Sequence, residues 1–185
     1  MTAQSPVLTD VATLRQRARQ NIEEGAITDS YGANRETVIK LLNDALATEL
    51  VCVLRYRRHH FMAAGLSAQS VAQEFMQHSI EEQAHADQIA SRIVQLRGEP
   101  KFSPDELSGR SHAEYVECDS LVDMIMENLV AERIAIDSYR EIINYLRDND
   151  STTRRMLEGI LAMEEEHADD LLSLVENYVS VDSKK

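Results

Sequence analysis

Apolar residues recur every three or four positions over four long stretches of this chain, and this spacing predicts four amphipathic helices. In each stretch the apolar residues form one stripe, which would face a shared core. The three Pro and five of the six Gly fall outside these stretches or at their ends, where residues that break helices belong. The predicted helices span residues 35–64, 67–97, 120–148 and 151–179.

Several residues mark where these helices begin and end. Ser67 is expected to cap the second helix, and Gly98 with Pro100 to stop it. Gly159 lies inside the fourth helix, where it costs about 1 kcal/mol relative to Ala. The close approach of a neighbouring backbone is one reason for a Gly at that position. The third and fourth helices are joined by a turn at residues 148–150.

Residues 101–119 form a long connection between the second and third helices. Within it, Ser103-Pro104-Asp105-Glu106 predicts a capping box, with Pro at the first position of a short helix. A connection of this length can cross the whole bundle. Residues 1–34 are a polar, slightly acidic arm, predicted to contain one short helix over 7–24. We therefore expect an N-terminal arm at 1–34 and one helical domain at 35–185.

The composition narrows the classes of function. A net charge of −13 argues against simple electrostatic binding to nucleic acid and suits a protein that attracts cations. Two cysteines, Cys52 and Cys118, do not make a disulfide framework, and they fit a reducing compartment. No run of 18 apolar residues occurs, and residues 1–10 lack a signal-peptide pattern. We therefore expect a cytoplasmic protein with no membrane partner.

Six acidic or imidazole side chains occupy stripe positions where an apolar residue is expected. Two of the helices carry the same phrase, Glu-x-x-His-Ala-Asp, and in a helix a Glu and a His three residues apart share one face. Each phrase is preceded, at a near-equal distance, by a single Glu on the stripe of the helix before it. The chain therefore consists of two similar halves. The six residues are Glu49, Glu82, His85, Glu132, Glu164 and His167.

The charge balance of these six residues indicates the kind of site they form. A buried, unpaired carboxylate costs several kcal/mol even after relaxation, so four in one core require protons, water or metal. Two divalent cations would balance four carboxylates, and two neutral imidazoles would complete their shells. The pattern thus predicts a dinuclear metal site. Tyr56 and Tyr139 follow Glu49 and Glu132 by two helical turns and share their faces. For Tyr139, an ordinary core position is an equal alternative.

Other titratable residues near the motifs have plainer interpretations. His78 lies one turn before Glu82, where an accessory ligand is conceivable and a core or surface His more common. Cys52 is interpreted as a small core residue. Three acidic residues point off the stripes and are interpreted as parts of solvated faces: Glu81, Glu165 and Glu166.

With these motifs in place, residues 35–178 resemble bacterioferritin, and the ferritin-like and Dps-like iron-storage proteins generally. Leu41-Leu42-Asn43 through Glu49-Leu50 and Tyr56 look like the first helix of bacterioferritin. The stretch from Glu82 to Arg97, followed by Gly98-Glu99-Pro100, resembles its second helix and exit. Its remaining ligands match Glu132, Glu164 and His167. The resemblance implies an all-α, ferritin-like antiparallel four-helix bundle with a long crossover between helices two and three.

The resemblance also implies a function, namely iron storage and detoxification. A ferroxidase would oxidise Fe²⁺ with O₂ or hydrogen peroxide at a di-iron site within each subunit of a multimeric shell. Two iron ions per subunit are expected, and Mn or Zn could occupy the same site. The hypothesis has Glu82 and Glu164 bridging both ions, Glu49 with His85 completing one shell, and Glu132 with His167 the other. Tyr56 would hydrogen-bond a ligand carboxylate or supply an electron.

Rival interpretations remain at this point. One is a di-iron or di-manganese oxidase or catalase that stores nothing. Another is a DNA-protecting Dps-type shell, against which the acidic arm counts. A third is a helical interaction protein with a vestigial site.

Three departures from bacterioferritin shape further expectations. Where bacterioferritin has a haem-ligating Met directly after the second-helix Glu, this chain has Gln83, so no haem is expected. The sequence runs for 18 residues after His167, which leaves little room for the short fifth helix of twenty-four-subunit cages. The arm and the long middle connection are similar to those of twelve-subunit Dps shells. We therefore expect a homododecamer and not a 24-mer, with DNA binding unlikely.

Overall fold

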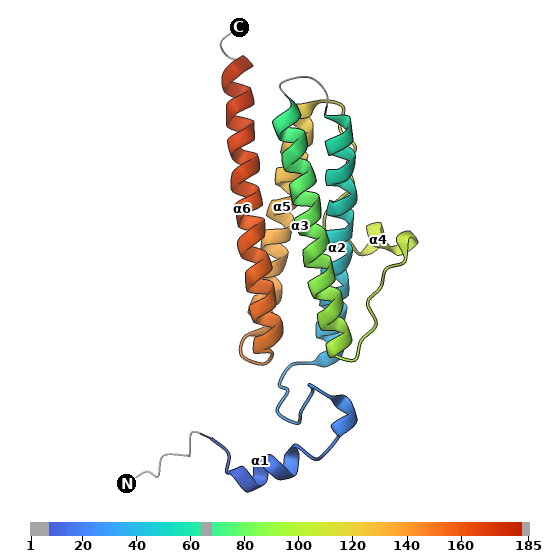
Figure 1. Ribbon diagram of the computed structural model, residues 1–185, viewed down its shortest axis with the longest axis vertical. Helices are drawn as coiled ribbons and strands as arrows, with labels where there is room; N and C mark the ends of the chain where they lie inside the picture. Colours follow the sequence, from blue (N-terminus) through green and yellow to red (C-terminus); the bar gives the residue numbers. More distant parts are fainter. Residues whose placement is uncertain (1–7, 64–67, 183–185) are drawn as a thin grey trace, which may run out of the picture.

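The computed structural model describes residues 8–63 and 68–182, and four long helices make an antiparallel bundle (Figure 1). Helix α2 packs against α3, α5 packs against α6, and the two pairs meet through α2 with α5 and α3 with α6. The all-α four-helix bundle is confirmed. Within the described residues, none of the helices could cross a membrane. The bounds are Arg35–Met62 for α2, Gln69–Gln95 for α3, Leu121–Leu146 for α5 and Ser151–Asp182 for α6.

The predicted long crossover is also present. It leads from the end of α3 to the start of α5, contains the short helix α4 (Pro104–Arg110), and lies against α2 (Figure 1). It returns the chain to the end of the bundle where α3 begins, so that α5 and α3 run in the same direction. Two arginines, one on α2 and one on the crossover, tie the crossover to α2. The Arg55 guanidinium donates to the Glu114 carbonyl at 2.8 Å, and Arg110 donates to the Asn43 carbonyl at 2.7 Å.

The N-terminal segment is less regular than expected. In place of one helix over 7–24 the described residues form α1 (Val11–Arg17) and the 3₁₀ turn η1 (Ile22–Glu24). Asn21 interrupts them because its backbone is left-handed, with φ 49°. This segment contacts one end of the bundle, where Tyr31 donates to Asp150 Oδ2 at 2.8 Å.

The helix ends follow capping chemistry with exceptions. The side chain of Asn34 accepts from the Thr37 amide at 2.9 Å and begins α2. Ser67, the expected cap of the next helix, lies outside the described residues. Ser103 precedes α4, and Pro104 takes the first helical position as predicted. The capping box was wrong in one respect, because the Ser103 side chain makes no capping bond and its carbonyl accepts from the Glu106 amide instead.

Helix α3 ends in a left-handed residue that is not a glycine. Arg97 has φ 62°, and the Gly98 amide donates to the Ile93 carbonyl at 2.9 Å. Gly98 itself is required by packing, since a Cβ there would lie 2.8 Å from Cγ2 of Ile39. The glycine that was expected to stop α3 therefore serves the contact between α3 and α2.

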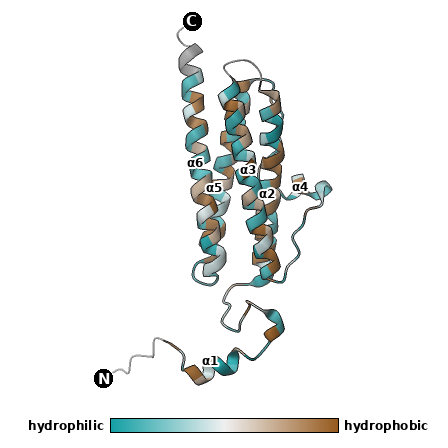
Figure 2. Ribbon diagram, in the orientation of Figure 1, coloured by the Kyte–Doolittle hydropathy of each residue, from teal (hydrophilic) through white to brown (hydrophobic). Residues whose placement is uncertain are grey.

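Two large apolar clusters fill the two ends of the bundle, and on every long helix at least one buried polar residue of the stripe lies between them. Apolar and polar positions alternate along these helices in Figure 2. On α3, for example, Phe75 belongs to one cluster and Ile89 to the other. On α6, Leu157 and Leu171 are divided in the same way. The stripe carboxylates and imidazoles all lie at this junction of the two clusters.

Gly159 of α6 has no packing reason to be a glycine within the part of the chain that the structure describes. The expectation of a close backbone was wrong for these residues, because an added Cβ would meet no atom of a neighbouring element within 4 Å. Replacing Gly159 by Ala should therefore raise the free energy of unfolding by about 1 kcal/mol, since Ala removes the entropic cost of Gly in a helix. Denaturant unfolding of both proteins at equal concentration tests this. A less stable variant would show that another surface packs on this face.

Candidate metal centre

The six stripe residues meet at the junction of the two core clusters. Helix α2 supplies one carboxylate and α5 another, while α3 and α6 each supply a Glu and a His from adjacent turns. None of the six is more than 5% exposed. The structure therefore brings all six predicted residues together: Glu49, Glu82, His85, Glu132, Glu164 and His167.

Four of them form a first donor group around His85. One ligand atom from each of Glu49, Glu82, His85 and Glu164 lies within 4.8 Å of the others. His85 Nδ1 is 3.0 Å from Glu164 Oε1, 3.4 Å from Glu49 Oε2 and 3.5 Å from Glu82 Oε2. This group has the size of a single metal position.

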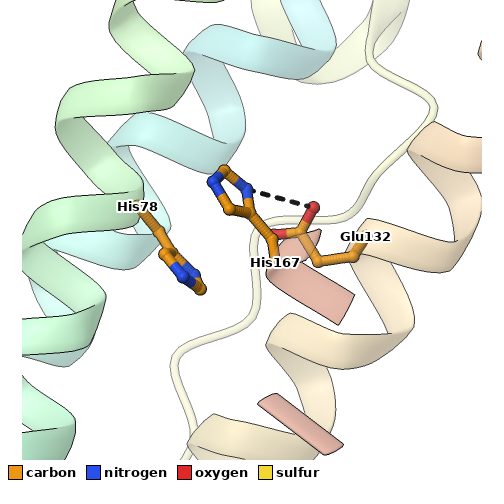
Figure 3. Close-up of side chains that lie close together, drawn as sticks. All are labelled: His78, Glu132 and His167. Carbon is orange, nitrogen blue, oxygen red and sulfur yellow. Dashed lines mark ion pairs between the residues drawn. The ribbon is translucent and has the colours of Figure 1, made fainter. Parts of the chain in front are cut away.

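A second donor group surrounds His167. It contains Glu82, Glu132, Glu164 and His167, again within 4.8 Å. His167 Nδ1 lies 3.6 Å from Glu82 Oε1, 3.7 Å from Glu164 Oε2 and 3.9 Å from Glu132 Oε2, the last contact being drawn in Figure 3. Glu82 and Glu164 belong to both groups, so each presents one oxygen to either side.

The two tyrosines connect the halves crosswise. Tyr56 of α2 donates to Oε1 of Glu132 on α5, and Tyr139 of α5 donates to Oε1 of Glu49 on α2. Burial, followed by the adjoining carboxylate, raises the pKa of both phenols well above the ordinary value, which keeps them protonated donors. The spacing of Tyr139 from Glu132 had left open whether Tyr139 is only a core residue. Its hydrogen bond to Glu49 shows that it also contacts the centre.

Two further residues touch the centre and carried no clear signal. Glu81 was expected on a solvated face and is instead half-buried, and its Oε2 lies 2.9 Å from His167 Nε2. The ring of His78 is buried and stacks on that of His167, with centroids 4.1 Å apart (Figure 3). His78 Nδ1 lies 3.2 Å from the hydroxyl of Tyr56. Glu81 precedes Glu82 and is off the stripe, so hydrophobic periodicity could not find it.

When no metal is bound, protons compensate the crowded charges of the centre. Burial, followed by the neighbouring Glu82, raises the pKa of Glu49 to about 8, and burial raises that of Glu132 well above its ordinary value. Burial opposes a charged His85 or His167, but the close carboxylates outweigh it and raise their pKa values to about 12 and about 11. Glu82 and Glu164 remain ionised. Burial and a nearby carboxylate raise their pKa values, but contacts with His85, His167 and one further Glu lower them by more.

Metal ions would satisfy the donor atoms of the centre better than hydrogen bonds among these atoms do. Buried polar atoms in proteins are almost always hydrogen-bonded. Here six buried atoms of the centre lack a hydrogen-bond partner among the described residues, and they face the two donor groups. Carboxylate oxygens with imidazole nitrogens suit Fe, Mn or Zn. The six atoms are Glu49 Oε2, Glu82 Oε1, His85 Nδ1, both carboxylate oxygens of Glu164, and His167 Nδ1.

Comparison with known families is decisive at this point, because the model of the ferritin-like domain matches residues 39–180. The chain belongs to the ferritin-like family. Among curated relatives of this ferritin-like protein, the bacterioferritin of Rhodobacter capsulatus is 32% identical and covers 76% of this chain and 84% of its own. The bacterioferritin of Mycobacterium avium is 30% identical over 75% of this chain and 84% of its own.

Solved structures agree on the architecture. A bacterioferritin-related protein of Bacteroides fragilis, described as a dodecameric thioferritin, superposes with a TM-score of 0.79 at 30% identity, covering 83% of this chain and 92% of that one. Dps from Thermosynechococcus elongatus superposes at 0.73 with 19% identity, covering 76% and 90%. The latter likeness concerns the fold alone.

Proposed function

We propose that this ferritin-like protein oxidises Fe²⁺ with O₂ or hydrogen peroxide and stores the product inside a homo-oligomeric shell. One observation carries the proposal: two buried donor groups, each with one His, share the carboxylates Glu82 and Glu164. Such a pair would hold two metal ions side by side, which is the arrangement needed to deliver two electrons together. The bacterioferritin relatives support iron as the metal and storage as the purpose.

In this proposal Fe²⁺ is the substrate. Two Fe²⁺ ions supply one electron each, and O₂ takes both with two protons to give hydrogen peroxide. Peroxide as oxidant takes two electrons and two protons to give two molecules of water. Glu82 and Glu164 would bridge the two metal positions, with Glu49 and His85 completing one and Glu132 and His167 the other.

The tyrosines would act by holding ligands. Tyr56 occupies Oε1 of Glu132, which leaves Oε2 for metal, and Tyr139 does the same for Glu49. Fixing a ligating carboxylate in this way orients it before the metal arrives. Tyr56 is also near enough to the second donor group to serve as an electron donor through Glu132.

The proposal is tested by an anaerobic Fe²⁺ titration followed by O₂ or by peroxide. Iron per subunit is then counted after gel filtration. Retention far above two iron ions per subunit is the expected result. Rapid oxidation with two or fewer ions retained would favour the rival, a di-iron oxidase or catalase that stores nothing. Absence of rapid oxidation with either oxidant would overturn the proposal.

We further propose a shell of twelve subunits. The relative from Bacteroides fragilis is described as dodecameric, and it is 30% identical to this chain over most of both lengths. Light scattering on the gel-filtration peak should give about twelve times the mass of the 20.9 kDa chain. A mass near that of twenty-four chains would contradict the dodecamer, and a monomer would also remove the storage function.

The proposed shell contains no haem. Gln83 follows Glu82, and its side-chain amide donates to Asp87 Oδ1 at 3.0 Å, so this position offers no soft axial ligand. Protein from haem-sufficient cells should therefore show no Soret band after gel filtration. A retained Soret band would contradict this part of the proposal.

A further inference from the structure

A second polar cluster adjoins the dinuclear centre. It comprises Glu74 and His78 of α3 and Asp170 of α6, and one ligand atom from each lies within 4.8 Å of the others. His78 Nε2 is 3.4 Å from Glu74 Oε1 and 3.9 Å from Asp170 Oδ2. None of these three residues belongs to either donor group of the dinuclear centre.

We propose that Glu74, His78 and Asp170 form a separate, mononuclear site for a divalent first-row cation. The two carboxylates and one imidazole match the donors that Fe²⁺, Co²⁺ and Zn²⁺ accept. The carboxylate side chains are 39% and 50% exposed, whereas the imidazole is 1% exposed. A cation can therefore enter from solvent, and the buried imidazole closes the inner side of the site.

The hydrogen bonds around His78 provide the strongest argument. The single hydroxyl hydrogen of Tyr56 goes to Glu132, so Tyr56 can only accept from His78, whose Nδ1 then carries the hydrogen. In the neutral ring Nε2 is left with a lone pair. This buried Nε2 has no hydrogen-bond partner among the described residues, and it faces the two carboxylates. Three acceptors that converge without a donor between them are a place for a cation.

The internal repeat indicates that helix packing at these positions does not by itself require this polar set. The repeat aligns Glu82 with Glu164 and His85 with His167. At the matching positions of the other half, Ile160 stands for His78, Met156 for Glu74 and Gln88 for Asp170. Ile160 is 2% exposed and fills the core at its position. An apolar residue is therefore sufficient for packing at the position that matches His78. The combination of Glu74, His78 and Asp170 occurs in only one half of the repeat, which indicates a role in binding a ligand.

The location suggests how the cation would be used. His78 stacks on His167, a residue of the second donor group, and contacts Tyr56, which holds Glu132. A cation on Nε2 would be linked to the dinuclear centre through the stacked rings of His78 and His167. If Fe²⁺ is the substrate, as the proposed function has it, this site would hold a further Fe²⁺ beside the centre.

Anaerobic equilibrium dialysis of the metal-free shell against Co²⁺ tests the proposal. Wild-type protein should bind three Co²⁺ ions per subunit, and the variant Glu74→Gln/Asp170→Asn should bind two. The matched control Glu166→Gln/Asp169→Asn removes two carboxylates from α6 outside the cluster and should still bind three. In crystals soaked with Co²⁺, an anomalous peak should lie on His78 Nε2, at about the 2.1 Å typical of imidazole–metal bonds.

The variant Glu82→Gln/Glu164→Gln separates this proposal from the dinuclear centre, because it should lose two ions and keep the one at His78. Wild-type protein that binds only two ions, both lost in that variant, would overturn the third site and leave the centre intact. Equal binding by the wild type and Glu74→Gln/Asp170→Asn would also overturn the third site. Wild-type protein that binds one ion, lost only in the Glu74/Asp170 variant, would instead remove the dinuclear centre.

Discussion

Replacing Glu82 and Glu164 together by Gln should lower the initial rate of Fe²⁺ oxidation by about 100-fold or more. Even residues that only support a ligand cost 10–100-fold in metal affinity or activity when they are removed. These two carboxylates belong to both donor groups, so their loss weakens both metal positions at once. The rate is measured by the absorbance of Fe³⁺ after anaerobic Fe²⁺ loading and addition of oxidant.

The matched control is Glu165→Gln/Glu166→Gln. It removes the same charge from one helix, at positions that belong to neither donor group. This control should oxidise Fe²⁺ at the wild-type rate, and circular dichroism should show the same helical content in all three proteins. Gln keeps the volume of Glu, but the variant removes carboxylates that hold His85 and His167 in the charged form, so the free energy of unfolding of the metal-free variant is measured beside its rate. A wild-type rate in Glu82→Gln/Glu164→Gln would refute the bridging assignment.

Binding of two divalent ions near neutral pH should release about four protons per subunit, because every ligand must be deprotonated to bind. Glu49, with a pKa raised to about 8, is mostly protonated at pH 7 when no metal is bound, and burial raises the pKa of Glu132 in the same direction. His85 and His167, with pKa values of about 12 and about 11, are charged. All four must lose a proton when metal enters. A pH-stat titration with Co²⁺ in unbuffered solution counts the protons.

The sign of the pH dependence follows from the same pKa values. As pH falls, protons compete more strongly for Glu49, Glu132, His85 and His167, so the metal affinity of the centre should fall. The Glu82→Gln/Glu164→Gln variant serves as control, because it should bind little metal at the centre and release few protons from it. Release of fewer than one proton per subunit by wild-type protein would contradict the charge distribution described here.

The sequence was sufficient to predict the bundle and to select the six residues, for a physical reason. A helix stripe that faces a core tolerates polar residues only when something compensates them. Glu49 and Glu132 therefore stand out against Val38 and Ile142 on the same stripes. The repeated Glu-x-x-His phrase added geometry, since its spacing fixes both side chains on one face of a helix.

The side-chain contacts between helices were harder to predict from the sequence. Which carboxylate Tyr139 would meet depends on how α5 lies against α2, and the tyrosines in fact reach across to the other half. Glu81 is off its own stripe, but α6 brings His167 against it. Helix ends were also missed where tertiary contacts decide them, as with Gly98, whose role is its contact with Ile39.

The acceptor Glu81 has no counterpart in the other half, where the residue before Glu164 is Met163. A carboxylate behind a ligating imidazole makes the other nitrogen more basic, so the His167 position should hold its ion more tightly than the His85 position. The two positions would then fill in order. A subunit with one ion has only one electron to give and must wait for the second. Below saturation, the oxidation rate should therefore rise more steeply than in proportion to the Fe²⁺ concentration.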